Sequence, residues 1–273
     1  MVEYLLAIIG TGEMGSWIAE QLVEKNIFRP EQIVLTRRNK GKLEKLAGKL
    51  GTAYTLNNCE AARNSKRILL SVRPQQMQEV LEEIKPFVSE SQIIMPVAVG
   101  LGMDFYEKFF PKNQIIRIMP NPFISSNLGL IAYSKNRNAD AYTIEMVKSF
   151  FGQLCESLVE IDDGKMHAFS TMAACSSAIF WEFFNSVYEQ AKEDGFDEKT
   201  ARELTLVSAL AASKHSLKSE ESLLELINSA ATPGGMTIEG IKHLRENGFA
   251  GNVKQALQKI SERSREIDRQ LNK

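Results

Sequence analysis

Short apolar runs alternate with stretches of helical spacing over the first 161 residues. The runs are Leu5–Ile9, Ile33–Thr36, Arg67–Val72, Gln92–Gly100, Ile115–Met119, Leu128–Tyr133 and Ser157–Ile161. Each has the length of a buried strand. Between them, apolar residues recur every three or four positions, for example Leu43, Leu46, Ala47 and Leu50 within Lys40–Leu50. This alternation predicts an α/β fold with a doubly wound, mostly parallel sheet.

The pattern changes after Asp162-Asp163-Gly164, because no convincing strand follows. We expect one long helix from Lys165 to about Asp194, closed by Gly195, and a second helix capped by Asp197. Further helices are expected over Ser219–Ala231, from Thr237 to about Glu246, and from Asn252 onward. The predicted domains are therefore 1–161, with the sheet, and 162–273, all helical. The broad apolar faces of these helices predict at least a homodimer.

The composition of the chain argues against a nucleic-acid-binding, membrane-binding or metal-binding protein. The chain has 273 residues with 33 basic and 34 acidic side chains, so no basic surplus points to nucleic acid or an anionic membrane. Its three cysteines are far apart and outside any C-x-x-C arrangement, which indicates a reducing compartment and no metal site. No signal-type segment is recognisable, so we expect a cytoplasmic protein. Met166–Trp181 lacks acidic and basic residues, but a membrane span needs about 20 apolar residues.

The first strand runs into the motif G-x-G-x-x-G, formed by Gly10, Gly12 and Gly15 around Thr11, Glu13 and Met14. Gly10 is expected to permit the tight turn, Gly12 to let a pyrophosphate approach, and Gly15 to let helix and strand pack closely. The helix that follows offers its N-terminal amides to phosphates. This order of strand, glycine turn and helix predicts a Rossmann-type dinucleotide site, with a purely structural turn as the alternative.

The second strand ends at Thr36-Arg37-Arg38-Asn39, without the carboxylate that holds the ribose of NAD. Two arginines there favour NADP (NADPH), while NAD stays possible and ordinary surface charges are the alternative. Ligands of such sheets lie beyond the carboxyl ends of the strands. Three segments are therefore expected to line the cleft: Val72-Arg73-Pro74, Ala98-Val99-Gly100 and Met119-Pro120-Asn121.

A second candidate site is Thr232-Pro233-Gly234-Gly235-Met236-Thr237. Pro-Gly-Gly leaves backbone N–H groups uncovered just before a helix, where a carboxylate can bind. The Thr237 hydroxyl can donate or accept a hydrogen bond. A plain helix-initiating turn is an equally good interpretation of this stretch alone.

Together these motifs resemble the pyrroline-5-carboxylate reductase family over nearly the whole chain. Gly10–Gly15 resembles its cofactor loop, Ser71–Gln75 its Val-Lys-Pro-Gln segment with Arg for Lys, and Met119–Asn121 its Met-Pro-Asn turn. Thr232–Gly240 resembles its Ser-Pro-Gly-Gly-Thr-Thr signature, the most specific of the set.

The resemblance implies reduction of a cyclic imine to proline by NADPH or NADH, in the cytoplasm, by dimers or larger assemblies. In that family a dimer completes the site between the nucleotide domain of one subunit and the helices of its partner. The substrate carboxylate would lie on the amides of Gly234, Gly235 and Met236. Thr237 would hydrogen-bond the ring nitrogen, and Asn121 would lie beside the nicotinamide.

The chain departs from the family between His167 and Ile179, where the usual helix-breaking Gly and Pro are missing. A smoother helix with bulkier side chains is expected there, reshaping the substrate wall. Ala173 replaces a Ser, Ile179 a Tyr, and Pro122 a Thr. Two alternatives therefore stay open: a reductase for another cyclic imino acid or small carboxylate, and a nucleotide-binding regulator without turnover. The β-hydroxyacid dehydrogenases share this layout and use a helix lysine, but the Gly and Asn residues expected around Lys165 are absent.

Overall fold

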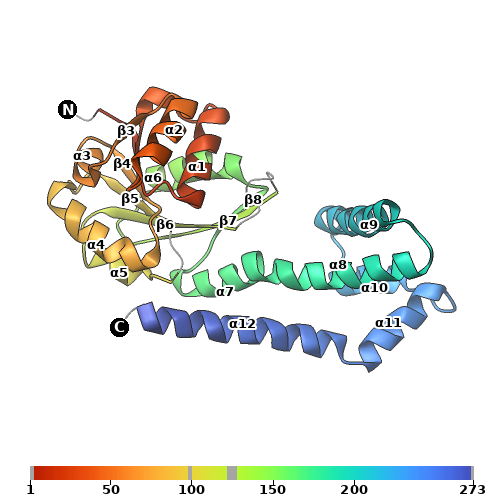
Figure 1. Cartoon of the computed structure of the whole chain (residues 1–273). Coiled ribbons are helices and arrows are strands. Elements are labelled where there is room, and N and C mark those ends of the chain that lie inside the picture. The colour runs from red at the N-terminus through yellow and green to blue at the C-terminus, as the bar shows by residue number, and fades with distance from the viewer. Residues whose placement is uncertain (1–2, 98–99, 122–127, 272–273) are drawn as a thin grey trace. The chain divides into compact units, whose positions relative to one another are not determined.

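The computed structural model describes residues 3–97, 100–121 and 128–271 of the chain (Figure 1). Its contacts divide the chain into two compact units, and we describe each by itself. The first unit comprises Met1–Ala174 and Ser261–Lys273, and the second Cys175–Ile260. The domain boundary expected after Ile161 stays a prediction.

The first unit is built on an eight-stranded sheet in the order β3-β2-β1-β4-β5-β6-β7-β8. Its strands are β1 (Leu6–Ile9), β2 (Ile33–Thr36), β3 (Ala53–Thr55), β4 (Arg67–Leu70), β5 (Ile93–Pro96), β6 (Gln114–Pro120), β7 (Leu130–Lys135) and β8 (Ser157–Glu160). Neighbours are parallel except β6 and β7. The predicted doubly wound, mostly parallel sheet is confirmed.

Helices cover both faces of this sheet. Side chains alternate along a strand, so Leu6 and Ile8 of β1 enter one core while Ala7 and Ile9 enter the other. The first core receives α1 (Glu13–Glu24), α2 (Lys40–Leu50) and α6 (Ala141–Phe151). The second receives α3 (Asn58–Arg63), α4 (Pro74–Ile84) and α5 (Met103–Glu107). Short 3₁₀ turns lie at Pro30–Gln32, Lys85–Phe87, Gly152–Leu154 and Asp163–Lys165.

The second unit is helical, as the sequence predicts. It holds α8 (Ser176–Glu193), α9 (Glu198–Lys218), α10 (Leu223–Ala230), α11 (Met236–Glu246) and the start of α12 (Phe249–Leu271). The predicted cap is confirmed, because the Asp197 carboxylate accepts a hydrogen bond of 3.0 Å from the Thr200 amide. No helix in the described part of the chain is both long and apolar enough to span a membrane.

The prediction of a smooth helix between His167 and Ile179 is wrong. α7 (Met166–Ser170) leads into a π-helical turn over Thr171–Cys175, and α8 begins only after it. One cause lies in the first unit, where the Asn121 side-chain amide donates to the Ala173 carbonyl at 3.0 Å. A carbonyl engaged from outside the helix favours such a break in the regular hydrogen-bond ladder.

Candidate functional site

The three motif glycines have distinct surroundings. Gly10 has a φ of +91°, and a Cβ there would lie 2.5 Å from the Val72 side chain. A Cβ on Gly15 would lie 2.5 Å from the Gly10 carbonyl oxygen, whereas one on Gly12 would meet nothing within 4 Å. Gly10 and Gly15 are therefore required by the packing of the turn. Gly12 faces open space, where another molecule could approach its backbone.

Helix α1 starts next to this open space. Gly12 is its N-cap and supplies no side-chain hydrogen bond, so the amides of the first turn lack a side-chain cap. Thr11 lies beneath the turn, fully buried, and its hydroxyl and amide both donate to the Thr36 carbonyl. The Thr36 hydroxyl in turn donates to Asn58 at 2.7 Å. Thr11 and Thr36 thus hold the glycine turn against β2.

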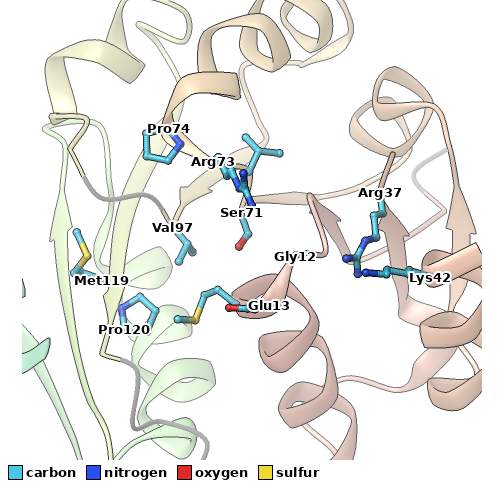
Figure 2. Close-up of a pocket in the computed structure, with 12 residues that line it drawn as sticks. Gly12, Glu13, Arg37, Lys42, Ser71, Arg73, Pro74, Val97, Met119 and Pro120 are labelled. Carbon is cyan, nitrogen blue, oxygen red and sulfur yellow. The ribbon is translucent and has the colours of Figure 1, made fainter. Parts of the chain in front are cut away.

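A cleft of about 540 Å³ opens at the carboxyl ends of the strands. It is lined by Gly12, Glu13, Met14, Arg37, Lys42, Ser71, Val72, Arg73, Pro74, Val97, Met119 and Pro120 (Figure 2). A neighbouring hollow of about 370 Å³ shares several of these residues and adds Gly10, Thr36 and Arg38. We call the two together the glycine-loop cleft. The structure thus brings most of the predicted cofactor residues together.

The two predicted arginines lie in different environments. Arg38 donates to the Glu79 carboxylate at 2.9 Å, and both side chains are exposed. Arg37 lies at one end of the cleft beside Lys42, and Met119 and Pro120 lie at the other end (Figure 2). Within the described residues, neither Arg37 nor Lys42 forms an ion pair. These two cations are available for a phosphate.

Sequence reasoning missed Lys42. The Asn39 carboxamide accepts a hydrogen bond of 2.9 Å from the Lys42 amide and so sets the start of α2. This cap carries the Lys42 side chain into the first turn of the helix, where it lines the cleft. The signal was present in the sequence, because Asn39 is a preferred N-cap residue directly before the helix predicted over Lys40–Leu50, and it places Lys42 in the first turn.

Asn121 is buried, and two of its hydrogen bonds join parts of the fold. Its side-chain oxygen accepts from the Leu130 amide at 3.1 Å, and its side-chain nitrogen donates to Ala173. Asn121 does not line the glycine-loop cleft as the structure has it. The expectations placed on Ala98, Val99 and Pro122 lie outside the described residues.

A buried ion pair joins β6 to the segment that precedes α7. Arg117 donates to Asp163, whose carboxylate also accepts from the Ser134 hydroxyl and the Met103 amide, each at 2.8 Å. Burial by itself raises the pKa of Asp163, but the Arg117 charge and these hydrogen bonds outweigh it, so the pKa lies below its usual value. The pair holds β6, β7 and the start of α5 together.

The loop Thr232–Thr237 belongs to the second unit. Gly234 has a φ of +79°, and the Gly235 amide donates to the Thr232 carbonyl at 3.0 Å. Gly235 is the N-cap of α11 and offers no side-chain hydrogen bond, and Met236 is 94% exposed. The first amides of α11 therefore lie at an open helix end that favours an anion.

Comparison with known proteins bears on both units. Residues 163–267 match the family model described as pyrroline-5-carboxylate reductase dimerisation, and residues 5–100 match NADP oxidoreductase coenzyme F420-dependent. Pyrroline-5-carboxylate reductase of Aquifex aeolicus is 28% identical, with 96% of this chain and 97% of that protein covered. The enzyme of Methanosarcina acetivorans is 26% identical over the same shares.

Solved structures agree with these relatives. A pyrroline-5-carboxylate reductase of Coxiella burnetii superimposes with a TM-score of 0.87 at 25% identity, covering 97% of this chain and 98% of that one. The Plasmodium falciparum pyrroline carboxylate reductase, solved with NADP bound, gives a TM-score of 0.83 at 24% identity, covering 98% and 99%. At that identity the second likeness concerns the fold alone.

Proposed function

Because this chain belongs to the pyrroline-5-carboxylate reductase family, we propose that it reduces L-1-pyrroline-5-carboxylate to L-proline. The observation that carries the proposal is the likeness to reductases over nearly the whole chain, in both units. The reaction adds a hydride to the carbon of the C=N bond and a proton to its nitrogen. Neither a reductase for another small carboxylate nor a regulator without turnover is favoured by these relatives.

The residues of the glycine-loop cleft fit NADPH. Gly12 leaves room for a pyrophosphate beside the uncapped end of α1. Arg37 and Lys42, which have no ion pair in the described part of the chain, suit a 2′-phosphate at one end of the cleft. Met119, Pro120 and Val97 would then border the nicotinamide at the other end. NADPH, when bound, supplies the hydride for the reduction.

The chain's own part in the chemistry is to hold and polarise the imine. We assign the substrate carboxylate to the amides of Gly234, Gly235 and Met236, which lie at the open end of α11. We assign to the Thr237 hydroxyl the hydrogen bond to the ring nitrogen, whose basicity rises as the hydride arrives. A donor placed where charge changes lowers the barrier more than it strengthens substrate binding.

Assembly into a homo-oligomer follows from the family, and we propose a homodimer. The second unit gives the physical reason, because its only buried apolar residues are Ala201 and Ala231. Large apolar side chains such as Trp181, Val207 and Leu217 are 57%, 57% and 79% exposed. A surface of this kind is typical of a subunit interface. We place the enzyme in the cytoplasm, in keeping with its three free cysteines.

The test is the oxidation of NADPH, followed by absorbance, with pyrroline-5-carboxylate as substrate and proline identified as the product. We expect turnover that saturates with both substrates. NADPH binding without turnover on this substrate would contradict the proposal, and a panel of other cyclic imino acids would then separate a different reductase from a regulator.

Thr237→Ala tests the assigned role of the hydroxyl. We expect kcat to fall by about 10- to 100-fold, the ratio that 1.4 to 2.7 kcal/mol of lost transition-state stabilisation produces, with little change in the affinity for NADPH. Thr237→Ser should recover most of the activity. Ser213→Ala, an exposed hydroxyl on α9 of the same unit, is the matched control. Equal loss in both alanine variants would remove Thr237 from the site.

A further inference from the structure

A second basic hollow lies at the amino ends of β4 and β5, whereas the glycine-loop cleft lies at the carboxyl ends of the strands. Its volume is about 400 Å³, and its lining includes Arg63, Lys66, Arg67, Ser89, Ser91 and Tyr142. We call it the Arg63–Arg67 pocket. Arg67 is the first residue of β4, whereas Ser71 follows the last and lines the cleft. A strand of four residues is about 13 Å long, so the two sites are separate.

The cations of this pocket lack negative partners. None of its lining residues is acidic, and within the described residues Arg63, Lys66 and Arg67 form no ion pair. The nearby Glu90 is held by Lys112 at 2.7 Å. Three like charges around one hollow repel each other, and an anion between them would relieve that repulsion.

Both guanidinium groups are held in place by apolar contacts. Arg63 lies 4.5 Å from the centre of the Phe87 ring, and Arg67 lies 5.5 Å from that of Phe150. The Arg67 Nε also donates to the Met146 sulfur. Burial lowers the pKa of Arg67, which means that its charge is incompletely solvated. Its Nη1 donates to the Leu5 carbonyl at 3.4 Å. The N–H groups that are engaged neither there nor with Met146 are left for a ligand.

The turn that carries the two serines of the pocket is held by buried side-chain hydrogen bonds. The buried Gln92 side chain accepts from the Ser89 amide and donates to the carbonyls of Ala62 and Ser65. Asn113 donates to the Ser89 carbonyl at 2.8 Å. The hydroxyls of Ser89 and Ser91, which lie 3.0 Å apart, are therefore presented from a fixed turn.

We propose that the Arg63–Arg67 pocket is a second ligand site that binds a phosphorylated small molecule. Arginine forks and serine hydroxyls match the oxygens of a phosphate group, and three cations suit a dianion better than a single carboxylate. The exposed ring of Tyr142 at the rim offers a face for an attached ring. The site is independent of the proposed reaction.

The test is calorimetric titration of the full-length protein with inorganic phosphate and with a nucleoside monophosphate. NADP⁺ is kept saturating, so that the glycine-loop cleft is filled. We expect binding by the native chain and a Kd raised about tenfold or more in the double variant Arg63→Gln with Lys66→Gln, because each removes a charged donor. The matched control, Lys45→Gln with Lys108→Gln, removes two exposed lysines elsewhere and should leave the Kd unchanged.

Arg67 is left intact in this design because its half-buried side chain contributes to folding. If the double variant melts at a lower temperature than the control, the single variant Lys66→Glu replaces it, since Lys66 is exposed. No phosphate binding by the native chain, or undiminished binding in the pocket variants, would overturn the proposal. Tighter binding of citrate than of the phosphates would overturn the assigned ligand class.

Discussion

Asp163→Asn is expected to destabilise the first unit strongly, although it only replaces one carboxylate oxygen by an NH₂ group. The Asp163 carboxylate accepts from three donors, on Arg117, Ser134 and Met103. The amide that replaces it retains one acceptor and turns an NH₂ group toward one or more of these donors. The Arg117 side chain, only 4% exposed, then keeps its charge without a counterion.

The magnitude follows from the burial of the pair. Removing one partner of a buried ion pair costs about 3 to 5 kcal/mol. Asp163 is 29% exposed, which argues for the lower end, about 3 kcal/mol. For a folding unit of this size, 1 kcal/mol shifts the melting temperature by about 2 to 4 °C, so we expect a fall of about 6 to 12 °C.

The assay is urea unfolding and thermal melting of both proteins at one protein concentration, because oligomer stability depends on concentration. Glu79→Gln is the matched control, since it breaks the exposed pair with Arg38 and should cost less than about 1 kcal/mol. An Asp163→Asn protein as stable as this control would refute the reasoning.

The pH dependence provides a second readout of the same pair. The folded pKa of Asp163 lies below its unfolded value, so its contribution is complete above the ordinary carboxyl pKa of about 3.9. It is lost as the pH falls through the lower folded value. The native chain should therefore approach Asp163→Asn in stability as the medium becomes more acidic, and a constant difference between pH 7 and pH 3 would contradict this assignment.

Three further predictions concern the cofactor and assembly. Arg37→Ala should raise the KM for NADPH by about 10- to 100-fold and leave the KM for NADH unchanged. Arg38→Ala should raise the KM for NADPH much less, because the Arg38 guanidinium is paired with Glu79; equal effects of the two variants in steady-state kinetics would contradict the assignment. Gly15→Ala should lower the melting temperature, because the new Cβ would clash with the Gly10 carbonyl oxygen. Gly12→Ala should melt at the native temperature but bind NADPH more weakly, and identical melting curves of the two variants would contradict this prediction. Val207→Glu, on an exposed apolar position of α9, should shift sedimentation toward monomer, and an unchanged mass would place the interface elsewhere.

Most of the sheet could be predicted because its strands contain short runs of apolar residues. In β1 all four residues are buried, and the same holds for β2 and β5. Such runs specify buried parallel strands from local sequence alone. Strand β3 was not predicted, because Ala53-Tyr54-Thr55 is short and Tyr54 is 44% exposed. It exists through its pairing with β2, a tertiary contact that leaves no periodic pattern.

The glycine-loop cleft was largely predictable for a similar reason. The three glycines directly follow β1, and Arg37 directly follows β2. The parallel topology then brings the carboxyl ends of these strands and of β4, β5 and β6 to the same side. The Arg63–Arg67 pocket was not predicted. Its cations come from the end of α3, from the link to β4 and from the first residue of β4, and its hydroxyls come from the turn before β5. Only the pairing of these two strands brings them together.

The π-helical turn shows why the substrate half is the harder one to derive. Loss of the family's Gly and Pro removes two local causes of a break, and local reasoning therefore predicts a regular helix. The break persists over Thr171–Cys175, where a hydrogen bond comes from Asn121, 52 residues earlier in the chain. The Asn121 side chain also accepts a hydrogen bond from the Leu130 amide, so it connects the end of β6 to β7 and to this turn. The shape of that segment is thus determined by a long-range contact, and substitutions within it need not straighten the helix.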